Sequence, residues 1–446
     1  MNELAGLPTG GDVTALPQRE LSLFDSTCII VGIIIGAGIY ETAPLVAQCL
    51  GSLSGILLIW LVGGGLALAG ALCYAELATA LPQAGGDYVY LSRAYGPPVG
   101  FLFGWTQLAV VRPGDIALMA FVFARYGQQL WPSLGLSQPV LAGLAVIVLT
   151  VMNIIGVKTG KWTQNILTAA KVLGMAVIIL VGLSAPSPVV QEAAAPPLTL
   201  GGVDLALILV MFTFGGWNEM AYVAAEIKDP NRNIVRGLVV GTVTVTILYL
   251  LMNAAFLAAL GLPQMAKSQA VAVETMARVF PDLAARAIAV LICISALGAV
   301  NGLIFTGARI SYALGAEHRA FQLLGVWHPR LGTPVWSLVC QAVICLAIIF
   351  LAGSFLDTII YTAPVVWLFF LGTGLAVVVL RRREPLLPRP YRASAYPLPP
   401  LLFTLCALFM LMSSTLYAWQ RVPWGLFLIS GVLVSGILVY ALTERH

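Results

Sequence analysis

Runs of about twenty apolar residues recur along nearly the whole 446-residue chain. Each run is long enough to cross the roughly 30 Å hydrocarbon layer of a bilayer as a helix. Only 9% of the residues are charged and 60% are apolar, whereas soluble domains carry about 25% charged residues. Strands of an outer-membrane barrel would alternate over segments of about ten residues, and that period is not present. The pattern therefore predicts an all-α integral membrane protein.

Twelve transmembrane spans fit this pattern, as two sets of five and a final pair. Their predicted boundaries are 25–48, 52–80, 97–126, 137–156 and 162–185, then 202–224, 236–262, 284–314, 334–353 and 357–380, and last 398–419 and 424–443. We expect a flexible cytoplasmic tail over 1–24, five-helix units over 25–185 and 202–380, and two additional helices over 398–443. The segment 81–96 is too polar to span and is expected to lie along the inner interface as a short helix.

Charged and reactive residues narrow the class further. Lysine and arginine concentrate in the loops and tails on one side of the spans, which predicts cytoplasmic termini. The formal net charge of +4 reflects this topology rather than nucleic-acid binding. All seven cysteines fall in apolar stretches, so a disulfide framework is not indicated. The sequence has no metal-ligand, nucleophile or phosphate-binding motif, so we expect no metal, no cofactor and no enzymatic activity.

Two glycine-rich segments interrupt apolar helices at comparable depth. The first span carries GIIIGAGIY at 32–40, where each of three glycines costs about 1 kcal/mol relative to alanine in a helix. Five spans later, FTFGGWNE at 212–219 interrupts another apolar helix. Glycines also serve close helix packing, and 63–65 with Gly70 suit that role. Paired interruptions at matching places in two halves instead indicate an inverted-repeat transporter with its site at the bilayer midplane.

Interrupted helices offer backbone groups to a ligand. Where a helix starts again, free N–H groups and the positive end of its dipole suit a carboxylate. Where a helix ends, bare carbonyls suit an ammonium group. Two such breaks facing each other would bind a zwitterion through backbone and leave selectivity to side chains. This arrangement predicts an amino acid as the substrate.

Several motifs, in order, resemble those of one family. They are IGAGIY at 35–40, GALCYAEL at 70–77, GGDY at 85–88, VRP at 111–113, GGWN at 215–218, DPNRN at 229–233, VNG at 300–302 and HP at 328–329. They cover spans one to ten and fade over the last two. The chain is similar to the L-type amino acid transporters of the amino acid-polyamine-organocation superfamily.

That resemblance implies a LeuT-type architecture: two inverted five-helix repeats with discontinuous helices 1 and 6, plus two additional helices, working by alternating access. Residues of the first break would meet the substrate carboxylate, and those of the second would supply carbonyls to the amine. The Phe212 ring would resemble the family's gate beside the substrate. The expected substrate-binding residues are Ile34, Gly36, Ala37, Gly38, Phe212, Thr213 and Gly215.

Lys171 lies within the fifth span, where an unpaired ammonium costs several kcal/mol. It stands about ten residues from the helix start, or about 15 Å at 1.5 Å per residue, which is long for snorkelling to the inner surface. In the family that the chain resembles, a lysine here occupies the region where sodium-coupled relatives bind a cation, between the first and eighth helices. We therefore expect Lys171 to act in coupling and transport to be sodium-independent.

Other charges within the spans have alternative interpretations. Arg112 and Asp115 are three residues apart and are expected to neutralise each other as a buried pair. Glu41 and Glu219 each follow a break, where they would sense a proton or a cationic side chain, or face an aqueous vestibule without a role. Charges toward the cytoplasmic helix ends are expected to be solvated, with an inner-gate network as the alternative. These are Glu76, Asp87 and Arg309.

The features together predict a secondary active transporter that exchanges neutral amino acids. Proton-coupled symport of neutral or cationic amino acids or polyamines is the alternative, and an amino acid sensor or a channel is the alternative from another class. Animal members of the L-type family attach to a glycoprotein through a cysteine in the loop after the third span, and the loop 127–139 has none. The resemblance with this difference implies a bacterial-type carrier in the lipid bilayer of the plasma (inner) membrane, without a disulfide-linked glycoprotein partner.

Overall fold

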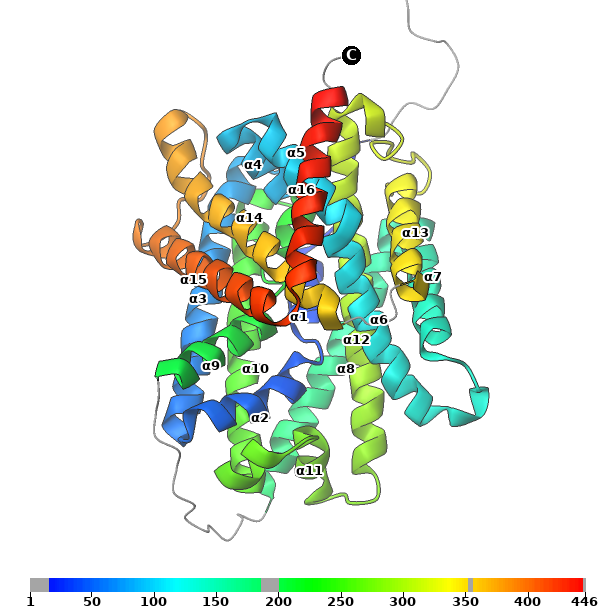
Figure 1. Ribbon diagram of the computed structural model, residues 1–446, viewed down its shortest axis with the longest axis vertical. Coiled ribbons are helices and arrows are strands. Elements are labelled where there is room, and N and C mark those ends of the chain that lie inside the picture. The colour runs from blue at the N-terminus through cyan, green and yellow to red at the C-terminus, as the bar shows by residue number, and fades with distance from the viewer. Residues whose placement is uncertain (1–15, 186–199, 352–355, 444–446) are drawn as a thin grey trace, which may run out of the picture.

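The computed structural model describes residues 16–185, 200–351 and 356–443, so most of the predicted tail 1–24 lies outside the described residues. Within these ranges the chain forms sixteen α-helices, and its extended pairing is limited to two isolated β-bridges (Figure 1). The first eight helices are α1 (Leu23–Ile34), α2 (Gly38–Leu50), α3 (Leu53–Ala80), α4 (Asp87–Tyr95), α5 (Pro97–Thr106), α6 (Arg112–Leu130), α7 (Gln138–Ile155) and α8 (Val157–Ser184). The other eight are α9 (Leu200–Thr213), α10 (Pro230–Lys267), α11 (Val271–Ala277), α12 (Ala284–Glu317), α13 (Val335–Leu351), α14 (Leu356–Arg383), α15 (Leu398–Arg421) and α16 (Pro423–Thr443).

The described helices account for twelve candidate spans. Nine are long and apolar enough to cross a membrane, and α1 with α2 makes a further span that is bent by 51°. The remaining two are shorter apolar helices, Gly202–Thr213 within α9 and α13. The predicted all-α membrane fold is therefore confirmed, and most boundaries agree within a few residues. The division into inverted repeats over 25–185 and 202–380 stays a prediction.

The segment 81–96 forms a helix, α4, as predicted, but α4 is not an exposed interfacial helix. Its residues Tyr88, Tyr90 and Leu91 are buried. The helix packs against α5 and α14. The segment is polar because it contains residues such as Asp87, whose carboxylate is fully buried and hydrogen-bonded inside the protein.

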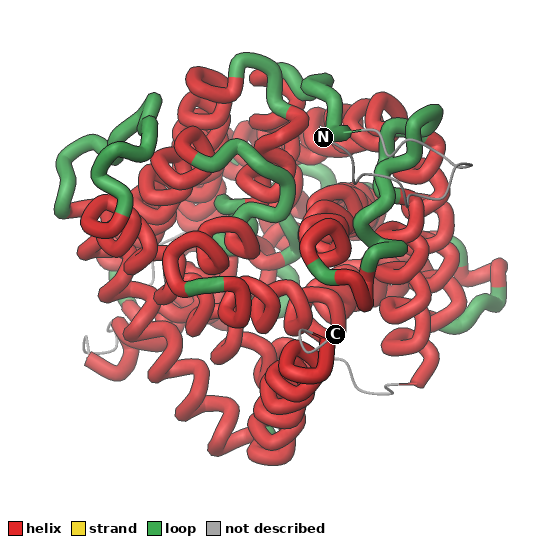
Figure 2. The backbone as a smooth tube through the Cα atoms, turned by 90° about the horizontal axis from the view of Figure 1, so that it is seen from above, coloured by secondary structure: helices red, strands yellow, loops and turns green. Residues whose placement is uncertain are grey.

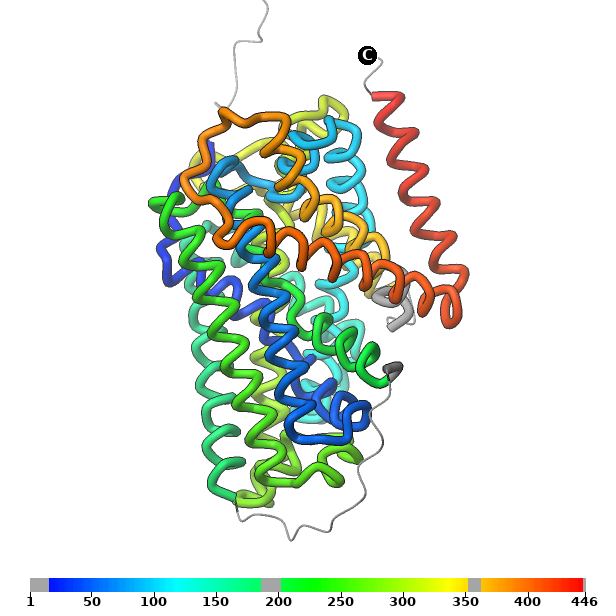
Figure 3. Tube along the Cα trace, turned by 90° about the vertical axis from the view of Figure 1, so that its left-hand side faces the viewer, coloured from blue at the N-terminus to red at the C-terminus, as the bar shows by residue number. Residues whose placement is uncertain are grey.

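Long helices surround the broken ones. The helices α8, α10 and α12 run along the longest axis of the molecule (Figure 1). α3 packs against α10, and α12 packs against α6. Figure 3 shows α15 crossing the bundle obliquely and α16 standing at its edge. Loops cover the end of the molecule that holds α4 and the C-terminal end of α16, as the view from above shows (Figure 2).

Glycines bring α3 close to its neighbours. A Cβ at Gly64 would lie 2.4 Å from the Thr246 side chain of α10, and a Cβ at Gly70 would lie 2.6 Å from the Trp217 ring. Both distances are far below van der Waals contact, so a larger residue would push the elements apart. The predicted packing role is confirmed for these two glycines, whereas Gly65 faces open space.

Candidate functional site

The first glycine-rich segment is a break between α1 and α2. A capping box starts α1: the Ser22 hydroxyl accepts the Asp25 N–H, and the Asp25 carboxylate accepts the Ser22 N–H. The helix ends at Ile34, and α2 starts at Gly38. The N–H of Tyr40 makes the first backbone bond of α2, so the N–H groups just before it have no partner within the helix. This N-terminus would stabilise an anion.

The second glycine-rich segment is a break after α9. The chain continues as a short 3-10 helix, η3 (Glu219–Glu226). Between them Gly216 has a φ of +105°, which L side chains rarely adopt. A Cβ at Gly216 would lie 2.7 Å from Cγ2 of Ile33, so glycine also lets this break approach α1. The hydroxyls of Thr42 and Thr213 lie 2.9 Å apart. The two breaks therefore meet in space.

Lys171 holds the first break against the surrounding helices. Its Nζ donates hydrogen bonds to the carbonyls of Gly32 at 2.5 Å, Ile35 at 2.9 Å and Ser295 at 3.0 Å. The side chain is fully buried and does not reach the inner surface. The ammonium thus joins α8 to α1 and α12, in the region between the first and eighth spans that the family resemblance indicated.

A cavity of about 230 Å³ lies between the two breaks. Ligand pockets for drug-sized molecules measure about 300–1,000 Å³, so this cavity suits a smaller molecule. Phe212 lines it and is 49% exposed, so its ring does not close the cavity. Ala37 does not line the cavity, and Glu41 is exposed and lies outside it. The predicted residues that line it are Ile34, Gly36, Gly38, Phe212, Thr213, Gly215 and Glu219.

Sequence reasoning missed a second group of cavity residues. These are Gln107, Met119, Tyr222, Trp367 and Phe370, among others. Gln107 opens a π-helical turn, η1 (Gln107–Val111), between α5 and α6. Such turns occur often at functional sites, but the apolar sequence around this one carries no signal for it. The aromatic residues of α14 could be recognised only as core residues.

The predicted close pair of Arg112 with Asp115 does not form, although the two charges attract each other electrostatically. Nη1 of Arg112 instead contacts Oε1 of Glu219 at 2.9 Å, and both side chains are almost fully buried. The second oxygen of Glu219 accepts the Thr306 hydroxyl at 2.5 Å. The break after α9 brings Glu219 to the cavity wall, where it faces α6. Glu219 therefore forms the close ion pair with Arg112, in place of Asp115 on the same helix. Glu219 is therefore a member of a buried ion pair and does not face an open vestibule.

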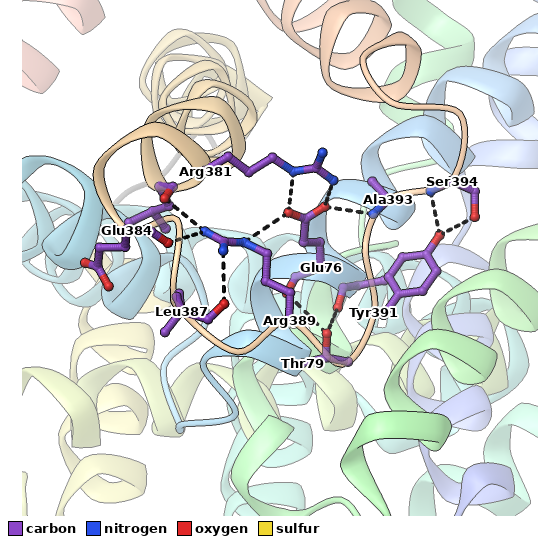
Figure 4. Close-up of polar contacts among 11 residues, drawn as sticks. Glu76, Thr79, Arg381, Glu384, Leu387, Arg389, Tyr391, Ala393 and Ser394 are labelled. Carbon is purple, nitrogen blue, oxygen red and sulfur yellow. Dashed lines mark hydrogen bonds and ion pairs between the residues drawn. The ribbon is translucent and has the colours of Figure 1, made fainter.

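Glu76, near the C-terminal end of α3, is buried rather than solvated, contrary to prediction. Its carboxylate accepts two hydrogen bonds from Arg381, at 2.7 and 2.6 Å, and one from the backbone N–H of Ala393 at 2.7 Å (Figure 4). Nε of Arg389 lies 3.5 Å away. The sequence places these partners more than 300 residues from Glu76, so spacing alone could not reveal them. The cluster fastens the segment after α14 to α3.

Two further buried charges close the same end of the molecule, where solvation was also predicted. The Asp87 carboxylate accepts hydrogen bonds from the hydroxyls of Tyr74, Tyr222 and Thr373. Arg309 of α12 binds both oxygens of Glu226 in η3, at 2.7 and 2.9 Å. These contacts join α3, α4, α12 and α14 to the segment that follows the second break. The predicted solvation of Asp87 and Arg309 is therefore wrong, and the alternative of an inner-gate network stays a prediction.

The chain before α1 adds to this closure. The backbone of Leu21 pairs with that of Glu226 and Lys228. Lys161 of α8 donates to the Asp25 carboxylate at 3.1 Å and to the Glu20 carbonyl at 3.0 Å. The base of α1 is thereby held to both η3 and α8.

Comparison with known proteins agrees with this geometry. A family model for amino acid permeases matches residues 21–438. The b(0,+)-type amino acid transporter 1 of Mus musculus is 32% identical over 436 residues, covering 95% of this chain and 88% of the relative. The large neutral amino acids transporter small subunit 2 of Homo sapiens is 32% identical over 452 residues, covering 97% of this chain and 82% of the relative. The chain belongs to the amino acid permease family.

Proposed function

We propose that this permease is a secondary active transporter that exchanges amino acids across the plasma (inner) membrane by alternating access. One observation carries the proposal: residues of two helix breaks line one small cavity, and N–H groups at the start of α2 have no partner within the helix. A zwitterion carries the two charges that such a pair of breaks would bind. The relatives named above are amino acid transporters, and each matches nearly the whole length of this chain.

The two breaks would divide the recognition of the substrate between them. The substrate carboxylate would bind N–H groups at the start of α2, and its ammonium group would bind carbonyls at the end of α9. Ala37 would contribute through its backbone alone, since its side chain does not line the cavity. The residues assigned to this site are Ile34, Gly36, Ala37, Gly38, Phe212, Thr213 and Gly215.

Exchange without sodium is supported by Lys171. Its ammonium supplies a fixed positive charge to three carbonyls at the first break. A fixed charge takes the place of a coupled ion, so the gradient of the exchanged amino acid drives transport. Neutral substrates are the first expectation because much of the cavity wall is apolar, with residues such as Met119 and Trp367.

Alternating access would begin from a form that is closed at the α4 end. The ion pairs of Arg309 and Arg381 lie at that end, whereas Phe212 is half exposed. We assign the closed end to the cytoplasm, together with both termini, because basic residues concentrate there. Rocking of the units 25–185 and 202–380 against each other would break these contacts and open the cavity to the cytoplasm.

Proton-coupled symport of neutral or cationic amino acids is a second candidate function. The carboxylates of Asp115 and Glu219 line the cavity, and a carboxylate within the membrane is a candidate proton carrier. An exchanger and a symporter can share one scaffold and differ in a few titrating groups.

Transport into vesicles that contain only this protein tests the proposal. We expect saturable uptake of labelled leucine, inhibited by unlabelled leucine but not by its methyl ester or its N-acetyl derivative, because each lacks one charged end. Uptake by the single chain would also support a bacterial-type carrier without a disulfide-linked glycoprotein partner, as the cysteine-free loop 127–139 indicates. Binding of leucine without saturable flux would favour a sensor and refute transport.

A further inference from the structure

The cavity wall carries more acidic than basic side chains. Within the described part of the chain, its charged lining residues are Arg112, Asp115 and Glu219. Arg112 and Glu219 form an ion pair and balance each other. Because Glu219 also accepts the Thr306 hydroxyl, both of its oxygens have partners. The acidic side chain that remains is that of Asp115.

Among the described residues, no hydrogen bond reaches the Asp115 carboxylate and no close ion pair includes it. The Arg112 guanidinium attracts it electrostatically but is bound to Glu219. A carboxylate at membrane depth is costly unless something binds it. The side chain is partly exposed and lines the cavity. A ligand that enters the cavity can therefore supply the missing partner.

Asp115 lies one helical turn from the expected position of the substrate's α-carbon. Met119 of α6 lies beside the first break, because a Cβ at Gly36 would be 3.8 Å from its Sδ. Asp115 precedes Met119 by four residues, so both lie on one face of α6, about 6 Å apart along its axis. A side chain of four carbons ending in an ammonium group spans a distance of this order. α6 packs against α12, as can be followed in Figure 1.

A second unsatisfied acceptor lies on the same wall. Gln107 is 6% exposed and lines the cavity, and its Oε1 has no hydrogen-bond partner. It opens the π-helical turn that precedes α6, two turns before Asp115. Both groups accept hydrogen bonds from N–H donors. The wall formed by η1 and α6 is thus prepared for a ligand rich in such donors.

We propose that Asp115 is a specificity-determining residue that binds the cationic end of a substrate side chain, so that the permease accepts cationic amino acids such as lysine and ornithine. The proposal rests on the proposed function, since it places the substrate's α-carboxylate and α-ammonium at the two helix breaks. Neutral amino acids would still bind through those backbone groups, without a partner for Asp115.

The test compares lysine with norleucine, a neutral amino acid with the same four-carbon stem. In vesicles preloaded with leucine, each compound competes with labelled leucine for uptake by the wild type and by Asp115→Asn. A hydrogen bond to a charged group is worth about 10- to 100-fold in affinity. We therefore expect Asp115→Asn to weaken inhibition by lysine about 10- to 100-fold and to leave inhibition by norleucine unchanged. Asp204→Asn is the matched control, because Asp204 is exposed and lies outside the cavity.

Further variants separate the possible causes of failure. Asp115→Glu keeps the charge and should keep inhibition by lysine, which distinguishes lost recognition from misfolding. Stabilisation of the purified protein against heat by lysine and by norleucine measures binding directly, so the proposal is tested even if the wild type exchanges no leucine. Equal effects of lysine on the wild type and on Asp115→Asn would overturn the proposal. Loss of proton-driven leucine uptake in Asp115→Asn, with no lysine binding by the wild type, would overturn it in favour of a proton site.

Discussion

Replacing Lys171 by methionine keeps most of the side-chain length and removes all three N–H donors. In the structure these donors bind the carbonyls of Gly32, Ile35 and Ser295. After the substitution, the Ile35 carbonyl still accepts the Ser295 hydroxyl at 2.8 Å. The Ser295 carbonyl lies inside the continuous helix α12. The Gly32 carbonyl is therefore the acceptor that loses most.

The expected effect of Lys171→Met falls on transport more than on stability. A buried carbonyl without a partner costs about 1–3 kcal/mol, whereas removal of a buried charge recovers several kcal/mol of desolvation. We expect little net change in thermal stability. The link between the α1 break and α8 is lost, however, and a bias of about 1–3 kcal/mol against the binding geometry reduces exchange about 5- to 150-fold.

The assay is exchange of labelled leucine in vesicles, measured over a range of pH. Lys158→Met is the matched control, because Lys158 lies on the same helix and is exposed. The control should exchange leucine at the wild-type rate. Wild-type exchange by Lys171→Met at every pH would refute the reasoning and remove the lysine from the mechanism.

Three other substitutions test the remaining contacts. Gly216→Ala forces a Cβ into a strained position against α1, which costs about 1–3 kcal/mol. Leucine should therefore no longer protect the variant from unfolding by heat, and normal protection would contradict the role of the break. Glu219→Gln leaves buried Arg112 without its carboxylate, and we expect the free energy of unfolding to fall by about 3–5 kcal/mol. The melting temperature in detergent should therefore decrease, and an unchanged melting temperature would contradict this. Glu76→Gln weakens the attachment of the segment 384–397, so protease should cleave that segment faster in vesicles with the cytoplasmic face outside; equal cleavage would show that the cluster does not hold it.

The fold followed from local features of the sequence. Apolar runs located the twelve spans, because a membrane helix must hide its backbone within one segment. The glycines at 32–38 and at 215–216 located both breaks, since glycine is unfavourable within a helix. What these patterns cannot supply is the partner of a charged side chain. Arg112 has a neighbour of opposite charge three residues away, yet it pairs with Glu219, 107 residues along the chain.

The same limit explains the wrong predictions of solvation for Glu76 and Asp87. A helix end with one charge looks solvated when its partners lie on another element. Glu76 is buried because Arg381 and Arg389 reach it from α14 and the loop that follows, and Asp87 is buried because three hydroxyls from different elements converge on it. The π-helical turn at Gln107 had no local signal either, because its residues resemble those of an ordinary apolar helix.

Counterflow of labelled leucine tests amino acid exchange most directly. Vesicles containing the purified chain are preloaded with unlabelled leucine or left empty, and the empty ones receive a proton gradient or a sodium gradient. We expect saturable uptake in the preloaded vesicles alone, unaffected by sodium. Uptake driven by the proton gradient into empty vesicles would contradict exchange and establish a symporter, and uptake driven by the sodium gradient would contradict the role given to Lys171.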